Sequence, residues 1–96
     1  MSSQSRSHYI RTVILDSLRV CQPYGIAMDL LVHGAVTSPG TVFITREEVD
    51  AELDWLGQKA LLLLEGAGEE RRVRLSAKGV TFVNERKPWA KLEVLD

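Results

Sequence analysis

The chain has 96 residues, of which 45% are apolar and 26% are charged, and its formal net charge is −1. These values are typical of one globular domain, and the balanced charge excludes a strong overall attraction to nucleic acid. No apolar run approaches the roughly 20 residues of a membrane span, the first residues lack a signal-peptide pattern, and Cys21 alone excludes an internal disulfide, so we expect a cytoplasmic protein without membrane contact.

A first helix is predicted from His8, after seven polar residues that we expect to be frayed. Apolar residues recur at steps of three and four along it, which is the spacing of one buried helix face. The stripe consists of Ile10, Ile14, Leu18 and Cys21. The turn residues 22–25 end this helix.

A short second helix is predicted for residues 26–33, and Gly34 ends it. The side chains expected to face the core are Ile26, Leu30 and Leu31. After a turn at 37–40, residues 41–44 are β-branched or aromatic and predict a short strand.

A third helix is predicted to begin at Thr45, because its hydroxyl and the carboxylate of Glu48 form a T-x-x-E capping box. Its core face is expected to hold Val49, Leu53, Leu56 and Ala60. Its exposed residues divide into two sides: Glu47, Asp50 and Asp54 on one, and Glu48, Glu52, Trp55 and Lys59 on the other.

Two strands joined by a glycine-containing link at 66–70 predict a β-hairpin over residues 61–76. In its second strand we expect Val73 and Leu75 to face inward and Arg72 and Arg74 outward. Ser76 is a capping residue for a last short helix that ends near residue 84.

The charges are unevenly distributed along the chain. Residues 46–54 carry Arg46 and five carboxylates, a net charge of −4, whereas residues 71–91 carry seven cations and Glu85, a net charge of +6. Such asymmetry indicates an interaction through one of the two regions.

The order of helix, helix, short strand, helix and hairpin resembles a winged helix-turn-helix domain. Residues 48–63 (EVDAELDWLGQKALLL) resemble its third helix and first wing strand, and residues 71–79 (RRVRLSAKG) are similar to the second wing strand and the following LTxxG. The chain is similar to small winged-helix proteins of Mu-like transposable phages and prophages, which have about this length and end soon after the LTxxG helix. The sequence departs from the family in two ways: Ala60 stands in place of the usual glycine, and Thr45 follows Gly34 by eleven positions, against three or four in a tight helix-turn-helix.

The resemblance implies an α+β fold over residues 8–84, with a three-helix core, a hairpin wing and a short C-terminal helix. Residues 85–96 then form a tail that docks on its own chain or on a second copy. It also implies a phage-encoded DNA-binding regulator or accessory protein that contacts the DNA backbone through its basic wing. The residues expected to contact DNA are Arg71, Arg72, Arg74, Lys78 and Arg46.

The third helix itself is poorly suited to reading bases, because five carboxylates on it would repel phosphates. The alternative function is therefore a protein-interaction module without DNA binding. Its contacts to a basic protein partner or to a second copy in a homodimer would be Asp50, Asp54, Trp55 and Trp89, although Trp55 is also suited to packing at the core edge.

Support for catalysis or for a cofactor is thin. Cys21, His8 and His33 are the candidates for nucleophile, base or soft-metal ligand, and none lies in a recognised spacing such as Cys-x-x-Cys or His-Glu-x-x-His. Asp29 and His33 are four residues apart, which is typical of a helix surface pair. We therefore expect no enzyme activity, no cofactor and no metal.

Overall fold

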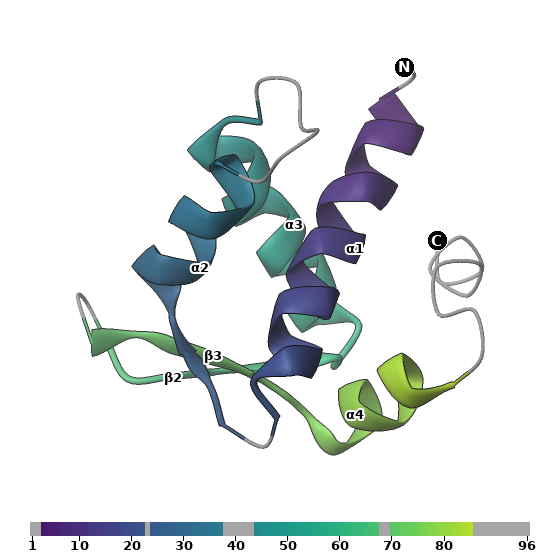
Figure 1. Ribbon diagram of the computed structural model, residues 1–96, viewed down its shortest axis with the longest axis vertical. Helices are drawn as coiled ribbons and strands as arrows, with labels where there is room; N and C mark the ends of the chain where they lie inside the picture. The colour runs from purple at the N-terminus through teal and green to yellow at the C-terminus, as the bar shows by residue number, and fades with distance from the viewer. Residues whose placement is uncertain (1–2, 23, 38–43, 68–69, 86–96) are drawn as a thin grey trace.

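The computed structural model describes residues 3–22, 24–37, 44–67 and 70–85, and side chains from Arg6 onward. Over these residues the chain is a small α+β fold of four helices and a three-stranded antiparallel sheet (Figure 1). The elements in chain order are α1 (Ser3–Val20), β1 (Ile26–Ala27), α2 (Met28–Val36), α3 (Arg46–Gln58), β2 (Leu62–Glu65), β3 (Arg72–Leu75) and α4 (Ala77–Asn84).

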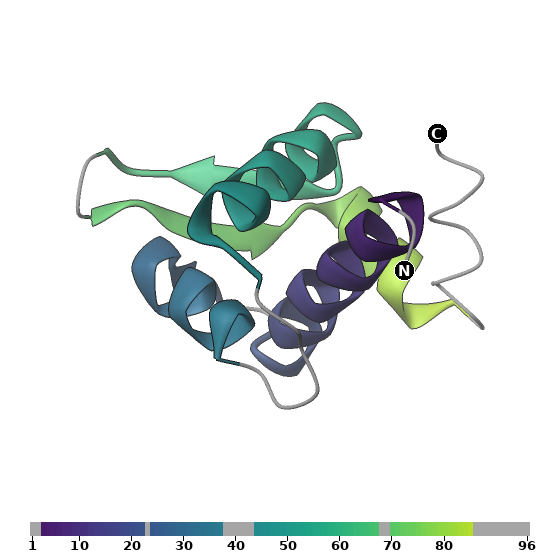
Figure 2. The ribbon, with the colours of Figure 1, turned by 90° about the horizontal axis from the view of Figure 1, so that it is seen from above.

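The helices α1, α2 and α3 enclose the core, and the sheet closes one end of it (Figures 1 and 2). Among the residues that the structure describes, the buried hydrophobic side chains are aliphatic apart from Phe82 of α4. The most deeply buried side chains are Ile10, Ile14, Leu15, Leu18, Val32, Val49, Leu53, Leu56, Leu61 and Val73. The predicted buried stripes are therefore confirmed at Ile10, Ile14 and Leu18 of the first helix and at Val49, Leu53 and Leu56 of the third. Cys21, the last residue of the first stripe, is half-buried.

The hairpin formed by β2 and β3 projects beyond the helices (Figures 1 and 2). Leu62 pairs with Leu75 and Glu65 pairs with Arg72 across it. In β3 the side chains alternate between exposed and buried, with Val73 and Leu75 inside as predicted. Ser76 caps α4 by accepting a hydrogen bond from the N–H of Gly79, which confirms the predicted last helix.

Three boundaries differ from the sequence expectations. Helix α1 begins at Ser3, ahead of the predicted start at His8. Ile26 is in strand β1, where it pairs with Val73, so the second helix begins two residues later than predicted. That helix continues through Gly34 to Val36. The second helix starts late because β3 has a free edge, on which residues 26 and 27 form a short strand. Their backbone groups are paired there and not in a helix.

Two side chains that we expected in the core are exposed. Leu30 is 64% exposed, because the buried face of α2 consists of Leu31, Val32 and Ala35. Ala60 lies beyond the end of α3 and has a φ of 62°, in the left-handed region that most residues avoid. The predicted strand at 41–44 falls largely outside the described residues, and Ile44 is buried but not in a strand.

Candidate interaction surface

One of the two exposed sides of α3 is occupied by contacts with α1. The Arg6 guanidinium donates to the Glu48 carboxylate (Nη2–Oε1 2.9 Å), and Arg11 forms an ion pair with Glu52. The guanidinium of Arg11 also lies 3.6 Å from the centre of the Trp55 ring. This side of the helix is therefore part of the α1–α3 packing.

Glu48 has a second role, at the start of α3. Its backbone N–H donates to the Thr45 hydroxyl (3.2 Å), and its carboxylate accepts from the Thr45 N–H (3.1 Å), which is the predicted capping box. The hydrogen bond from Arg6, reinforced by the Thr45 N–H, lowers the pKa of Glu48 from 4.5 to about 2, and the same contact raises the pKa of Arg6.

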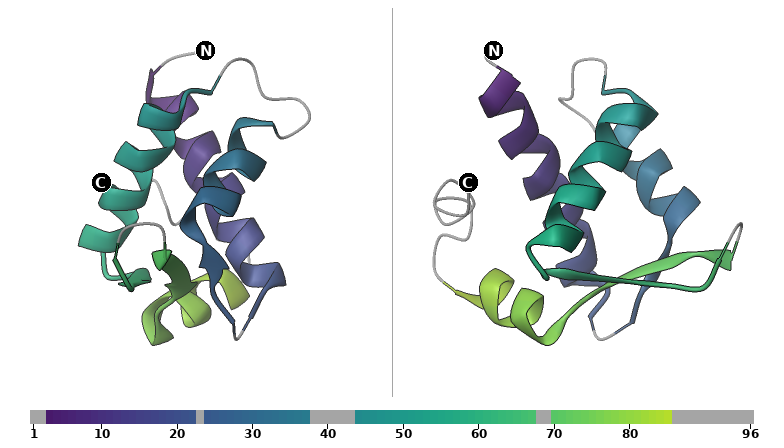
Figure 3. Two further views of the ribbon diagram at one scale, coloured as in Figure 1. Left: turned by 90° about the vertical axis from the view of Figure 1, so that its left-hand side faces the viewer. Right: turned by 180° about the vertical axis from the view of Figure 1, so that it is seen from behind.

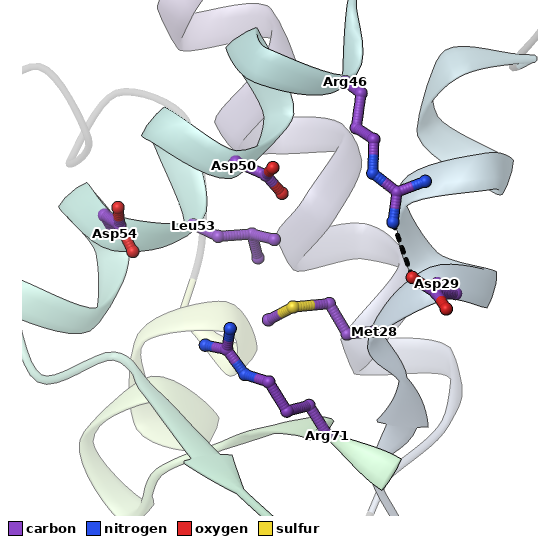
Figure 4. Close-up of a pocket in the computed structure, with 7 residues that line it drawn as sticks. All are labelled: Met28, Asp29, Arg46, Asp50, Leu53, Asp54 and Arg71. Carbon is purple, nitrogen blue, oxygen red and sulfur yellow. Dashed lines mark hydrogen bonds and ion pairs between the residues drawn. The ribbon is translucent and has the colours of Figure 1, made fainter. Parts of the chain in front are cut away.

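On the opposite side of α3, the carboxylates lack such contacts with the residues that the structure describes. Glu47, Asp50 and Asp54 are exposed, and among the described residues no ion pair engages Asp50 or Asp54. Both carboxylates line a groove of about 390 Å³ between α3, the start of α2 and the start of β3. The groove is lined by Met28, Asp29, Arg46, Asp50, Leu53, Asp54 and Arg71 (Figure 4).

The groove has an apolar floor and charged walls. Met28 and Leu53 point into it from α2 and α3, between the carboxylates of α3 and the guanidinium of Arg71 (Figure 4). Asp29 accepts a hydrogen bond from Arg46 (2.6 Å) at one end of the groove. Both side chains of this pair are more than half exposed, so it contributes little stability and can be exchanged for other contacts.

The hairpin cations that we expected to contact DNA have partners within the chain. Arg74 forms an ion pair with Glu65 on the neighbouring strand, and Arg72 donates to the Gly25 carbonyl (2.8 Å). Lys78 donates to the Lys59 carbonyl (3.0 Å) at the start of α4. These contacts direct three of the predicted DNA-contacting cations towards the protein itself.

The hairpin as a whole carries no net positive charge. Between residues 62 and 75 there are three arginines and three glutamates, Glu65, Glu69 and Glu70. The net charge of +6 over residues 71–91 leaves out these three acids, because they precede Arg71 in the hairpin. With α3 included, the surface formed by α3 and the hairpin is negative.

The predicted partner residues are brought together only in part. Asp50 and Asp54 share the groove, whereas Trp55 lies half-buried on the α1 side of α3, which agrees with packing at the core edge. Trp89 and the rest of the expected tail lie outside the described residues. Asp29 and Met28 were missed, because only the fold places the start of α2 beside α3.

A second hollow, of about 440 Å³, lies between the end of α1, β1 and α2. Apolar and small residues dominate its lining, which consists of Ser17, Cys21, Gly25, Ile26, Ala27, Leu30, Leu31, Gly34 and Arg72. The Ser17 hydroxyl already donates to the Val13 carbonyl (2.9 Å), so it presents no unsatisfied donor to this hollow.

Within the described part of the chain, no three His, Cys, Asp or Glu side chains are grouped so that they could hold a metal ion. None of the described helices is long and apolar enough to cross a membrane. Comparison with models of known protein families, with curated proteins and with solved structures finds no match to this chain.

Proposed function

We propose that this chain is a winged-helix interaction module that binds a basic protein segment in the groove beside α3. The winged-helix interpretation is supported by the order of the elements and by β1, which adds a third strand to the hairpin sheet. Small proteins of Mu-like phages remain the family that the sequence resembles.

The observation that carries this proposal is the state of the carboxylates on α3. Asp50 and Asp54 are exposed one helical turn apart, and among the described residues neither has an ion-pair partner. A partner with two or three lysines or arginines would find these carboxylates already oriented towards one groove. Each exposed pair contributes only about 0.2–1 kcal/mol, so several contacts are required for useful affinity.

The groove floor adds a second type of contact. Lysine and arginine side chains have aliphatic stems that pack on apolar surface while their charged ends stay in water. Met28, which is half-buried at the start of α2, offers such a surface beside the acidic wall of the groove. Arg71 at the edge of the groove would repel a partner's cation at that end, so the partner's cations should bind at the end near Asp50.

DNA binding through the hairpin is the second candidate function. Its support is the group of Arg71, directly before β3, and Arg72 and Arg74 on that strand, together with Lys78. The exposed pair of Arg74 with Glu65 is weak enough for a phosphate to displace the glutamate. Against it stand the neutral total charge of residues 62–75 and the carboxylates of α3. The charges therefore favour a basic protein partner.

Two ligands separate these functions: a fluorescein-labelled arginine-rich peptide and a random-sequence DNA duplex, each titrated with the full chain at low salt. We expect binding of the peptide, and we expect Asp50→Asn with Asp54→Asn to weaken it several-fold, mainly through slower association. Asp16→Asn removes a carboxylate from α1 and serves as the matched control. Equal losses for the control and the groove variant would contradict a specific groove.

The DNA arm has its own diagnostic variant. If duplex binding dominates, Arg72→Ala with Arg74→Ala should weaken it for all sequences and flatten the plot of log K against log salt by about 2 units. Duplex binding with that response, combined with no peptide binding, would refute the interaction module and establish the second candidate.

A further inference from the structure

Helix α2 presents an exposed apolar side to solvent. Leu30 is 64% exposed, and it lines the second hollow together with Gly34 (the left panel of Figure 3 views the molecule from the side of α2). Leu30 and the largely apolar lining of this hollow thus lie on the outer side of α2, where another molecule can reach them.

Gly34 is not explained by the packing of its own chain. It lies in the interior of α2, where glycine weakens a helix, and a Cβ placed on it would meet no atom within 4 Å. No positive φ requires glycine there, since the positive-φ residues of the described chain are Ala60 and Gly66. A glycine on an exposed helix face does, however, permit the close approach of another helix.

Leu30 and Gly34 are one helical turn apart, so the same side of α2 carries a protruding side chain and a gap. A two-fold axis makes residue i contact residue j while j contacts i. Antiparallel packing of two α2 helices about an axis near Val32 would place Leu30 of each copy over Gly34 of the other. The surface is thus complementary to itself.

The polar residues of this helix agree with the arrangement. Asp29 and His33 lie on the same flank of α2, one turn apart. The antiparallel pairing brings the Asp29 carboxylate of one copy towards the His33 imidazole of the other. Asp29 also pairs with Arg46 of its own chain, and because that pair is exposed and weak, the carboxylate can turn towards the imidazole. Asp29 also lines the acidic groove, so the groove lies beside this contact and is not covered by Leu30.

We propose that the chain forms a two-fold homodimer through α2, with Leu30 of each copy seated on Gly34 of the other. The proposal goes beyond the basic-segment function and does not depend on it. Because few apolar side chains contribute, we expect roughly micromolar association.

Sedimentation equilibrium of the full chain over a range of concentrations tests the dimer. We expect the mass to rise from 10.7 kDa towards twice that value. Leu30→Glu and Gly34→Gln should each raise the dimer Kd about tenfold or more. Gly34→Gln should also raise the melting temperature of the monomer, because glutamine favours the helix and its Cβ meets open space.

Leu64→Glu is the matched control, because Leu64 is an exposed leucine of similar chemistry on β2, away from α2. It should leave the mass curve unchanged. The proposal is overturned if the parent is monomeric at about 500 µM, if either α2 variant dimerises like the parent, or if the control disrupts the dimer equally.

Discussion

The backbone at Ala60 leads to a prediction that runs against the usual effect of glycine: Ala60→Gly should stabilise the protein. Ala60 has a φ of 62°, which for a residue with a Cβ costs about 1–2 kcal/mol and for glycine costs almost nothing. The methyl group is exposed, so its removal loses little packing.

The hydrogen bonds at this position belong to the main chain and survive the change. The Ala60 N–H donates to the Gly57 carbonyl (3.0 Å), and the Ala60 carbonyl accepts from the Ser76 hydroxyl (2.5 Å). Glycine adds about 0.4–1 kcal/mol of entropy cost through the unfolded chain. The difference is a net stabilisation of about 0.5–1 kcal/mol, which corresponds to a rise of about 2–8 °C in Tm for a domain of this size.

Urea and thermal unfolding of the two variants Ala60→Gly and Ala51→Gly measure this effect. Ala51 is exposed in the interior of α3, so its replacement by glycine should destabilise by about 1 kcal/mol. The opposite signs of the two changes are the test. If Ala60→Gly lowers the urea midpoint as Ala51→Gly does, the left-handed conformation at residue 60 is wrong.

Three other substitutions test the core, the packing of α4 and the capping pair. Leu56→Ala removes a side chain with no exposed surface and should lower the free energy of unfolding by about 2–5 kcal/mol in urea titrations; a loss below about 1 kcal/mol would contradict its burial. Gly79→Ala would place a Cβ 2.1 Å from the Leu61 carbonyl oxygen and should unfold or severely destabilise the chain, whereas Gly57→Ala, with open space around its Cβ, should not. Glu48→Gln keeps a side chain that can cap the helix but removes its charge. Because the pKa of Glu48 is lowered to about 2 in the folded chain, the parent should have a higher Tm than this variant above about pH 4.5. That difference in Tm should disappear as the pH falls towards 2. An advantage that stays constant over this range would exclude the ion pair as its source.

The third helix and the hairpin were predictable because their signals are local. The capping box of Thr45 and Glu48 lies within four residues, and the alternation in β3 lies within five. Short-range hydrogen bonds and side-chain periodicity decide such elements almost independently of the rest of the chain. The capped start, the buried leucines and the outward arginines followed from these patterns.

The start and the phase of α2 were not predictable in this way. Residues 26–36 are apolar on more than one helix side, so periodicity permits either Leu30 or Leu31 and Val32 in the core. The choice is made by contacts with α3 and by the pairing of β1 with β3, which joins residues 26 and 73. Residues this far apart in the sequence form no local pattern from which their pairing could be predicted.

The candidate groove also depends on contacts between residues that are far apart in the sequence, because these contacts decide which carboxylates of α3 are engaged in ion pairs. The sequence predicts two acidic sides on α3, with Glu48 of the capping box and Trp55 on one of them, but it does not show what either side contacts. The packing of α1 does, because it brings Arg6 and Arg11 to Glu48 and Glu52, about forty residues away in the chain, and leaves Asp50 and Asp54 facing the groove. Removing carboxylates from the first side should therefore disturb the fold, whereas removing them from the second should disturb only binding. Helix α1 thus determines which acids of α3 face the groove, although none of its described side chains lines that groove.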